Sequence, residues 1–186
     1  SVVISASASG KKNEAITASG PVSAAGPELR IRTSKFSFDH QAGLSGVVSS
    51  DLLLAGDWKE PELSGRVELR EARFEMGKWR KFEPSAERSD YYARMSLDLN
   101  INAERNVWYR EGASSVEVRG GLLFKKDHYA QATTVGNIDA VKGYYIYLGN
   151  TFTVQSGRMT FTGENPPNPA IDVTAVSEER GRPVRI

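Results

Sequence analysis

Residues 135–175 constrain the fold most, because apolar and polar residues alternate there between glycine-containing breaks. Tyr145 and Tyr147 are typical of the pattern, in which every second side chain is apolar. Period two places such side chains on one face of a strand, and Gly149-Asn150 offers the positive φ that a tight hairpin needs. The stretch therefore predicts a β-meander with one apolar face.

Similar alternation runs through most of the chain, with little sign of helical periodicity. Gly and Pro separate the alternating runs, and both Gly20-Pro21 and Ser156-Gly157 have the composition of turns. Many short strands at this spacing predict an all-β fold. We expect about fifteen strands, at residues 2–8, 15–19, 28–33, 35–40, 47–55, 63–71, 73–76, 95–103, 107–110, 114–124, 138–142, 144–148, 151–155, 158–162 and 171–176.

Residues 78–93 differ from the rest, since they are charged, do not alternate and contain Pro84. A short helix would fit this segment, but the absence of an apolar stripe favours a loop. We expect one β domain, a fragment of a longer protein, in which this loop joins two similar meander halves at residues 1–77 and 94–186.

Side-chain parity predicts a sheet with one apolar and one charged face. Leu97, Leu99 and Ile101 point one way, while Asp98 and Asn100 point the other. The apolar face has to be covered. Two inner faces could fill each other in a closed sandwich or barrel, an open barrel or half-pipe could hold an apolar ligand, or the face could dock a protein. Periodicity does not choose among these.

Composition and motifs argue against several functions. The formal net charge of +1 gives no reason to expect nucleic-acid binding, and the absence of cysteine excludes disulfides and thiolate metal sites. His40 and His128 each follow an aspartate. On a strand, each histidine and the aspartate before it would point to opposite faces, so they would not form one site. No catalytic motif is present, and we expect neither an enzyme nor a bound cofactor or metal.

The spacing of aromatic, glycine and Asn-Pro positions in the second half resembles the C-terminal domain of the TamB family. The resemblance rests mainly on residues 97–186 and is carried by Gly143, Tyr145, Tyr147, Gly149, Phe152, Val154, Gly157, Met159, Phe161 and Asn168-Pro169. Leu44-Ser45-Gly46 and residues 62–65 fit looser repeats of the same family.

This resemblance implies an elongated, curved, mostly antiparallel sheet, a taco-like half-pipe or open barrel with an apolar concave face. It further implies the periplasmic portion of a protein anchored in the bacterial inner membrane, with a TamA-like outer-membrane barrel as partner. The expected function is to carry phospholipids between the two membranes. The alternative is a chaperone-like module that helps to insert unfolded outer-membrane proteins or autotransporters by β-augmentation.

An apolar half-pipe would lower the cost of moving an acyl chain through water. We therefore expect one set of alternating apolar side chains to contact phospholipid acyl chains. The set is Val67, Leu69, Leu97, Leu99, Ile101, Val116, Val118, Leu122, Phe124, Tyr145, Tyr147, Phe152, Val154, Met159, Phe161, Ile171 and Val173.

Residues 144–148 depart from the family pattern, because Tyr144, Ile146 and Leu148 are apolar where outward-facing residues are usually polar. Either the 78–93 segment covers this side of the strand, or a β-bulge shifts the parity locally.

Overall fold

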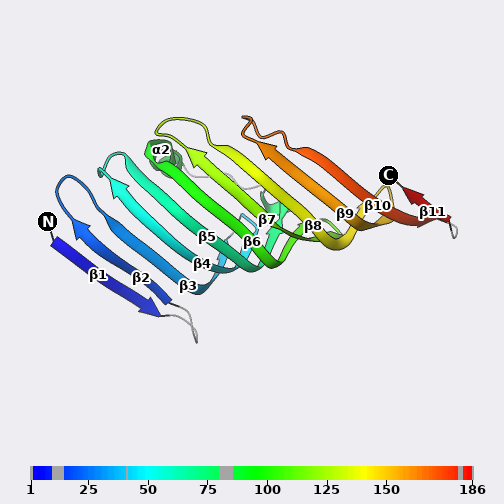
Figure 1. Cartoon of the computed structure of the whole chain (residues 1–186), viewed down its shortest axis with the longest axis horizontal. Coiled ribbons are helices and arrows are strands. Elements are labelled where there is room, and N and C mark those ends of the chain that lie inside the picture. The colour runs from blue at the N-terminus through cyan, green and yellow to red at the C-terminus, as the bar shows by residue number, and fades with distance from the viewer. Residues whose placement is uncertain (1, 10–14, 41, 80–85, 180–181, 186) are drawn as a thin grey trace.

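In the computed structural model, eleven strands form a single sheet in which spatial order follows chain order (Figure 1). The structure describes residues 2–9, 15–40, 42–79, 86–179 and 182–185. Its elements are β1 (Val2–Ser9), β2 (Ala15–Val22), β3 (Leu29–His40), β4 (Leu44–Gly56), β5 (Pro61–Glu75), α1 (Met76–Trp79), α2 (Ala86–Arg94), β6 (Ser96–Glu111), β7 (Ser114–Lys126), β8 (Thr133–Tyr147), β9 (Asn150–Thr162), β10 (Ala170–Glu179) and β11 (Arg182–Arg185).

Neighbouring strands are antiparallel except for β5 and β6, which are parallel. Because β5 and β6 are parallel, the chain must return from the C-terminal end of β5 to the N-terminal end of β6. The helices α1 and α2 belong to this crossover. The expected loop at residues 78–93 was wrong where α2 forms. The first half, β1 to β5, and the second half, β6 to β11, are each antiparallel meanders that meet at this crossover. That the two halves are similar repeats remains a prediction.

The strands are fewer and longer than expected, because several predicted breaks are β-bulges inside strands. Lys35, Glu71 and Asn106 adopt positive φ within β3, β5 and β6, at the points where the register with β4, β4 and β7 shifts. A bulge bends a strand and increases its twist without ending it. Gly20-Pro21 and Ser156-Gly157, expected as turns, likewise lie within β2 and β9. The predicted strand breaks therefore mark positions inside strands, several of them bulges, and not the ends of strands.

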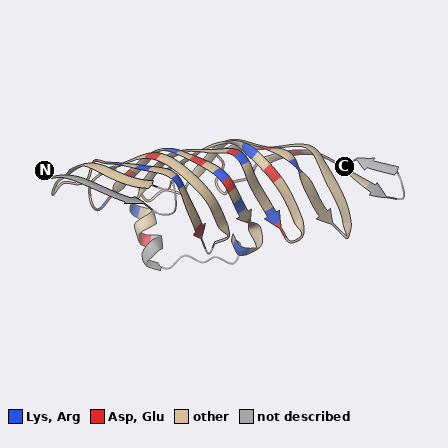
Figure 2. Ribbon diagram, turned by 90° about the horizontal axis from the view of Figure 1, so that it is seen from below, with Lys and Arg blue, Asp and Glu red and all other residues tan. Residues whose placement is uncertain are grey.

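The sheet arches along its length, and α2 lies beneath the arch (Figure 2). The sheet does not close, because β1 and β11 stand at opposite ends of the strand order. Among the described residues no large side chain is fully buried. The expectation of a curved open sheet is confirmed, and the closed sandwich or barrel is excluded, since either would bury large side chains between opposed walls.

Lys126, at the end of β7, anchors α2 against the concave side of the sheet. Its ammonium group is buried and donates hydrogen bonds to the carbonyl oxygens of Ala93, Met95 and Asp127 at 2.9, 2.7 and 3.1 Å. The same nitrogen lies 5.0 Å from the centre of the Tyr92 ring. Burial lowers the pKa of Lys126, and the charge of Asp127 opposes that shift. Because the carbonyls at a helix C-terminus lack helical partners, a cation there stabilises the helix end.

Candidate functional site

An unbroken apolar row crosses the concave face from β3 to β10, perpendicular to the strands. Each member of the row is the direct register partner of the next, and no polar side chain interrupts it. Directly paired residues share one face of a sheet, so the row is a continuous surface. Its members are Phe36, Val48, Leu69, Ala103, Gly120, Ile138, Met159 and Ile171.

The register places all the expected acyl-chain contacts on this same face. Leu99 pairs with Phe124, Ile101 with Leu122, and Val107 with Val118. Further along the sheet, Tyr145 pairs with Phe152, and Ile171 with Met159. The remaining predicted positions follow by alternation along these strands, namely Val67, Leu97, Val116, Tyr147, Val154, Phe161 and Val173. The structure brings the set together; its role in binding acyl chains stays a prediction.

Sequence reasoning found Val67 and Leu69 but missed the other first-half members of the face, on β3 and β4. Phe36, Phe38, Leu52 and Leu54 point to the same side as Leu69. Their alternation is as clear as that of the second half, but the bulge at Lys35 changes the parity within β3 and obscures it. Combining the strand pattern with the bulge would have found them.

Glycines on the concave face bring neighbouring strands close together. Gly65, Gly120 and Gly136 have φ of +135°, +149° and +138°. A Cβ atom at each of these positions would overlap a backbone carbonyl oxygen of the adjacent strand. This region of φ is accessible almost only to glycine, and glycine kinks are a means of curving a sheet. These glycines therefore support the curvature of the sheet, and they place no side chain on its concave face.

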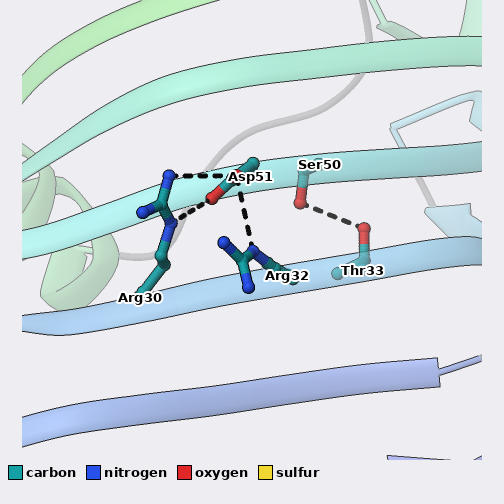
Figure 3. Close-up of polar contacts among 5 residues, drawn as sticks. All are labelled: Arg30, Arg32, Thr33, Ser50 and Asp51. Atoms are coloured by element: carbon teal, nitrogen blue, oxygen red, sulfur yellow. Dashed lines mark hydrogen bonds and ion pairs between the residues drawn. The ribbon is translucent and has the colours of Figure 1, made fainter.

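One hydroxyl pair on the concave face satisfies itself. Thr33 of β3 and Ser50 of β4 are register partners whose side-chain oxygens lie 3.0 Å apart (Figure 3). A hydroxyl that already has a hydrogen-bond partner is less costly to cover with an apolar ligand than an unpaired one. Covering this pair with an apolar ligand therefore costs less free energy than covering two isolated hydroxyls would.

The opposite, convex face carries cross-strand ion pairs. The Arg30 guanidinium donates to Asp51 at 2.8 Å, and Arg32 approaches the same carboxylate at 3.4 Å (Figure 3). Arg158 makes the equivalent contact with Asp139 at 2.7 Å. Hydrogen bonds from the arginines hold the pKa values of Asp51 and Asp139 below their usual range. The convex face is therefore the more charged one, whereas the unbroken apolar row lies on the concave face.

A shallow, open depression of about 400 Å³ lies in the convex face around Arg66, Glu104, Arg119 and Asp139. Its charged lining is unsuited to an acyl chain. The apolar site is instead an open surface, consistent with an arch that has no opposing wall.

Among the described residues, no group of three or more His, Asp or Glu side chains could hold a metal ion. The His40 Nδ1 accepts a hydrogen bond from the Ala42 backbone at 3.1 Å, a local structural contact. No helix in the described ranges has the length and hydropathy to cross a bilayer.

Comparison with known proteins relates the chain to a protein family. The family model of the TamB C-terminal domain matches residues 5–186, nearly the whole chain. No curated protein matches the sequence. The match extends over both meander halves, further than residues 97–186, on which the sequence resemblance mainly rested.

Proposed function

Because this chain belongs to the TamB C-terminal domain family, we propose that its concave face carries phospholipid acyl chains between the inner and outer bacterial membranes. The family is associated with the translocation and assembly module. In the proposal the chain lies in the periplasm as part of a protein anchored in the inner membrane, and a TamA-like outer-membrane barrel receives it. The observation that carries the proposal is the continuous apolar row, against which the described residues pack no second sheet.

The energetics favour such a surface. Exposing a 16-carbon chain to water costs roughly 12 kcal/mol, at about 0.8 kcal/mol for each methylene. An apolar wall offsets much of that cost because it replaces water on one side of the chain. The arch is open, so a charged headgroup can stay in solvent while the acyl chain lies along the row.

The dimensions of the face suit a path more than a single pocket. The apolar row crosses eight strands, β3 to β10, which at about 4.8 Å apart span about 34 Å. Two opposed leaflets of hydrocarbon are together roughly 30 Å thick. A lipid on the face can therefore shift from strand to strand while its acyl chains remain covered. The side chains offer area without fixed hydrogen-bond geometry, so binding should depend little on headgroup type.

A second candidate function rests on the open ends of the sheet. Within the described residues, β1 pairs only with β2, and β11 only with β10. The outer edge of such a strand can accept a strand from an unfolded outer-membrane protein or autotransporter by β-augmentation. This activity would use backbone groups at the edge, whereas lipid transport would use side chains in the middle of the sheet.

Site-specific photocrosslinking separates the two functions. A photoreactive amino acid at Val118, on the concave face, is compared with the same residue at Leu53, which lies on the convex face and is 40% exposed. We expect lipid crosslinks at position 118 and none at 53. Crosslinks to unfolded outer-membrane protein at strand β1, with no lipid at 118, would favour the second function and reject the first.

The matched variants Val118→Asp and Leu53→Asp test the mechanism. Each introduces the same carboxylate into the same sheet, but only the first places a charge on the proposed path, where desolvation is costly. Lipid crosslinking should fall strongly in Val118→Asp and persist in Leu53→Asp. Equal retention of lipid by both folded variants would refute the proposed path.

A further inference from the structure

A line of β-bulges crosses the sheet alongside the apolar row. Lys35, Glu71 and Asn106 interrupt the register in β3, β5 and β6, and each lies within three positions of the row member on its own strand. A bulge inserts an extra residue and bends its own strand. Bulges that line up from strand to strand therefore bend the sheet along one line.

The line continues into the second half of the sheet. Val141 in β8 and Gln155 in β9 are each the extra residue at a register shift with a neighbouring strand. The shift at Val141 comes just before residues 144–148, where a bulge is one of the two explanations that the sequence allows for the apolar side chains. The bulges thus accompany the apolar row from β3 to β9.

Three of these bulges hold residues with a side chain in a strained backbone conformation. Lys35, Glu71 and Asn106 have φ of 49°, 52° and 55°. Asparagine tolerates this left-handed region, but lysine and glutamate disfavour it because their Cβ atoms come too close to the backbone. Such strain persists only where the surrounding structure holds it, and it often marks a functional constraint.

The strands that face two of these bulges supply hydrogen-bond acceptors for them. A bulged residue leaves the regular ladder, so its backbone N–H needs another partner. The Lys35 N–H donates to the Ser49 hydroxyl oxygen at 3.2 Å, and the Asn106 N–H donates to the Glu117 carboxylate at 2.9 Å. Lys142 in turn lies 3.1 Å from that carboxylate. These contacts hold both bulges in place.

The third bulge, at Glu71, is held by a close approach of the facing strand. Gly46 of β4 lies opposite Glu71 and Ala72. A Cβ atom at Gly46 would lie 2.5 Å from the Ala72 Cα, so this site accepts only glycine. Ala72 is 2% exposed, because the two strands are tightly packed here. Each of the three bulges is therefore matched by a residue on the facing strand, as expected of a built feature of the fold.

We infer that this line of bulges sets the curvature of the concave face, and that Lys35, Glu71 and Asn106 act as positioning residues for a bound acyl chain. The inference rests on the proposed function. On a bent face, side chains on both sides of the bend contact the same acyl chain, whereas a flat face touches it from one side only. Residues with a Cβ also fix the bend, because glycine at the same positions would leave more backbone conformations open.

The matched variants Glu71→Val and Glu71→Gly test the bend. Both remove the same carboxylate, but a β-branched residue disfavours positive φ, whereas glycine accepts it. Since the chain has no cysteine, Glu62→Cys and Arg73→Cys place two spin labels on exposed sites of β5 that flank the bulge. A straight strand would separate these positions by about 36 Å, and a bend shortens that distance. Pulsed electron paramagnetic resonance should give a longer distance in Glu71→Val and an unchanged mean distance in Glu71→Gly.

Lipid crosslinking from the photoreactive residue at position 118 is the functional readout. It should fall several-fold in Glu71→Val, with circular dichroism showing a folded sheet, and persist in Glu71→Gly. A folded Glu71→Val with the parent distance, or with the parent level of crosslinking, would overturn the inference. An equal loss of crosslinking in both variants would also overturn it, because the carboxylate and not the backbone would then be responsible.

A second pair of variants keeps the inference testable if Glu71→Val does not fold. Glu117→Leu and Glu117→Gln both remove the ion pair with Lys142, but only glutamine keeps an acceptor for the Asn106 N–H. The Asn106 amide should exchange its hydrogen faster in Glu117→Leu than in Glu117→Gln, and lipid crosslinking should be lower in the leucine variant. Equal crosslinking in the two folded variants would overturn the inference.

The spin-label distances also separate this inference from the proposed function, because they are measured without lipid. A parent protein that gives no lipid crosslinks at position 118 would refute the proposed function, and with it the positioning role. The distances would still decide whether the bulges set the curvature.

Discussion

Gly120 offers the sharpest test of how the arch is built. It lies on the concave face in β7, has φ of +149°, and pairs with Ala103 and Ile138 on either side. In Gly120→Ala, the new Cβ would overlap the Asn137 carbonyl oxygen and lie 3.0 Å from the Ile138 Cα. These are backbone atoms, so no side-chain rotation relieves the contact. Strands β7 and β8 would have to separate.

The expected cost has two parts. Holding alanine in a backbone region used almost only by glycine costs about 1–3 kcal/mol. Weakening about two ladder hydrogen bonds adds about 1 kcal/mol for each. The free energy of unfolding should therefore fall by roughly 3–5 kcal/mol, a large share of the 5–15 kcal/mol typical of a domain.

Urea unfolding followed by circular dichroism measures this loss, with two matched glycine controls. Gly157→Ala also adds a methyl to the concave face, but its nearest neighbours would be the Ala140 and Val173 side chains at 3.1 and 3.2 Å, and the Asp172 carbonyl oxygen would lie at an ordinary contact distance of 3.8 Å. It should cost less than about 1.5 kcal/mol. Gly77→Ala, in α1 with no atom within 4 Å, should be neutral or slightly stabilising. If Gly120→Ala were as stable as Gly157→Ala, the close-approach argument would be wrong.

Three further predictions concern polar contacts. Lys126→Met should lower the free energy of unfolding by about 3 kcal/mol, because the carbonyls of Ala93 in α2 and of Met95 just after it lose a buried charged donor. Proteolysis within α2 should accelerate in parallel. The hydrogen bond from Arg158 lowers the pKa of Asp139 below 3.8 in the folded protein. The Asp139 carboxylate therefore stabilises the fold at pH values above 3.8, and this stabilisation is lost as the pH falls through the folded-state pKa. Asp139→Asn should thus lower the urea midpoint at pH 7 but not near pH 2; an equal drop at both would contradict the ion-pair explanation. Thr33→Val alone should cost about 1 kcal/mol by leaving the hydroxyl of Ser50 unpaired, whereas Thr33→Val with Ser50→Val should recover most of that loss; additive costs in urea titrations would argue against the hydroxyl pair.

The chemistry of the faces could be predicted from the sequence because period two survives wherever a strand is regular. Leu97, Leu99 and Ile101 share a face in β6, as their alternation requires. Strand boundaries were harder. Asn106, with φ of 55°, is a residue type common in turns, but it lies at a bend within β6 and does not end the strand. Local residue types signal a change of direction, and only pairing with the next strand decides between a bulge and a turn.

The crossover and the open arch depended on long-range contacts that no local pattern contains. The charged 86–94 segment is a weak helix candidate alone, yet Lys126, distant in sequence, donates to the carbonyl of Ala93 at its end and to that of Met95 just after it. Closure of the sheet was equally undetermined, because opposed inner walls and an open concave face require the same alternation. The positive φ of Gly120 and its close approach to β8 became visible only in the paired sheet.

Native mass spectrometry of the chain purified from bacterial cells tests the central claim most directly, since an uncovered apolar face should retain lipid. The account predicts phospholipid adducts on the parent and on Leu53→Asp, and their loss from folded Val118→Asp. A parent protein without adducts, or adducts retained equally by both variants, would contradict it.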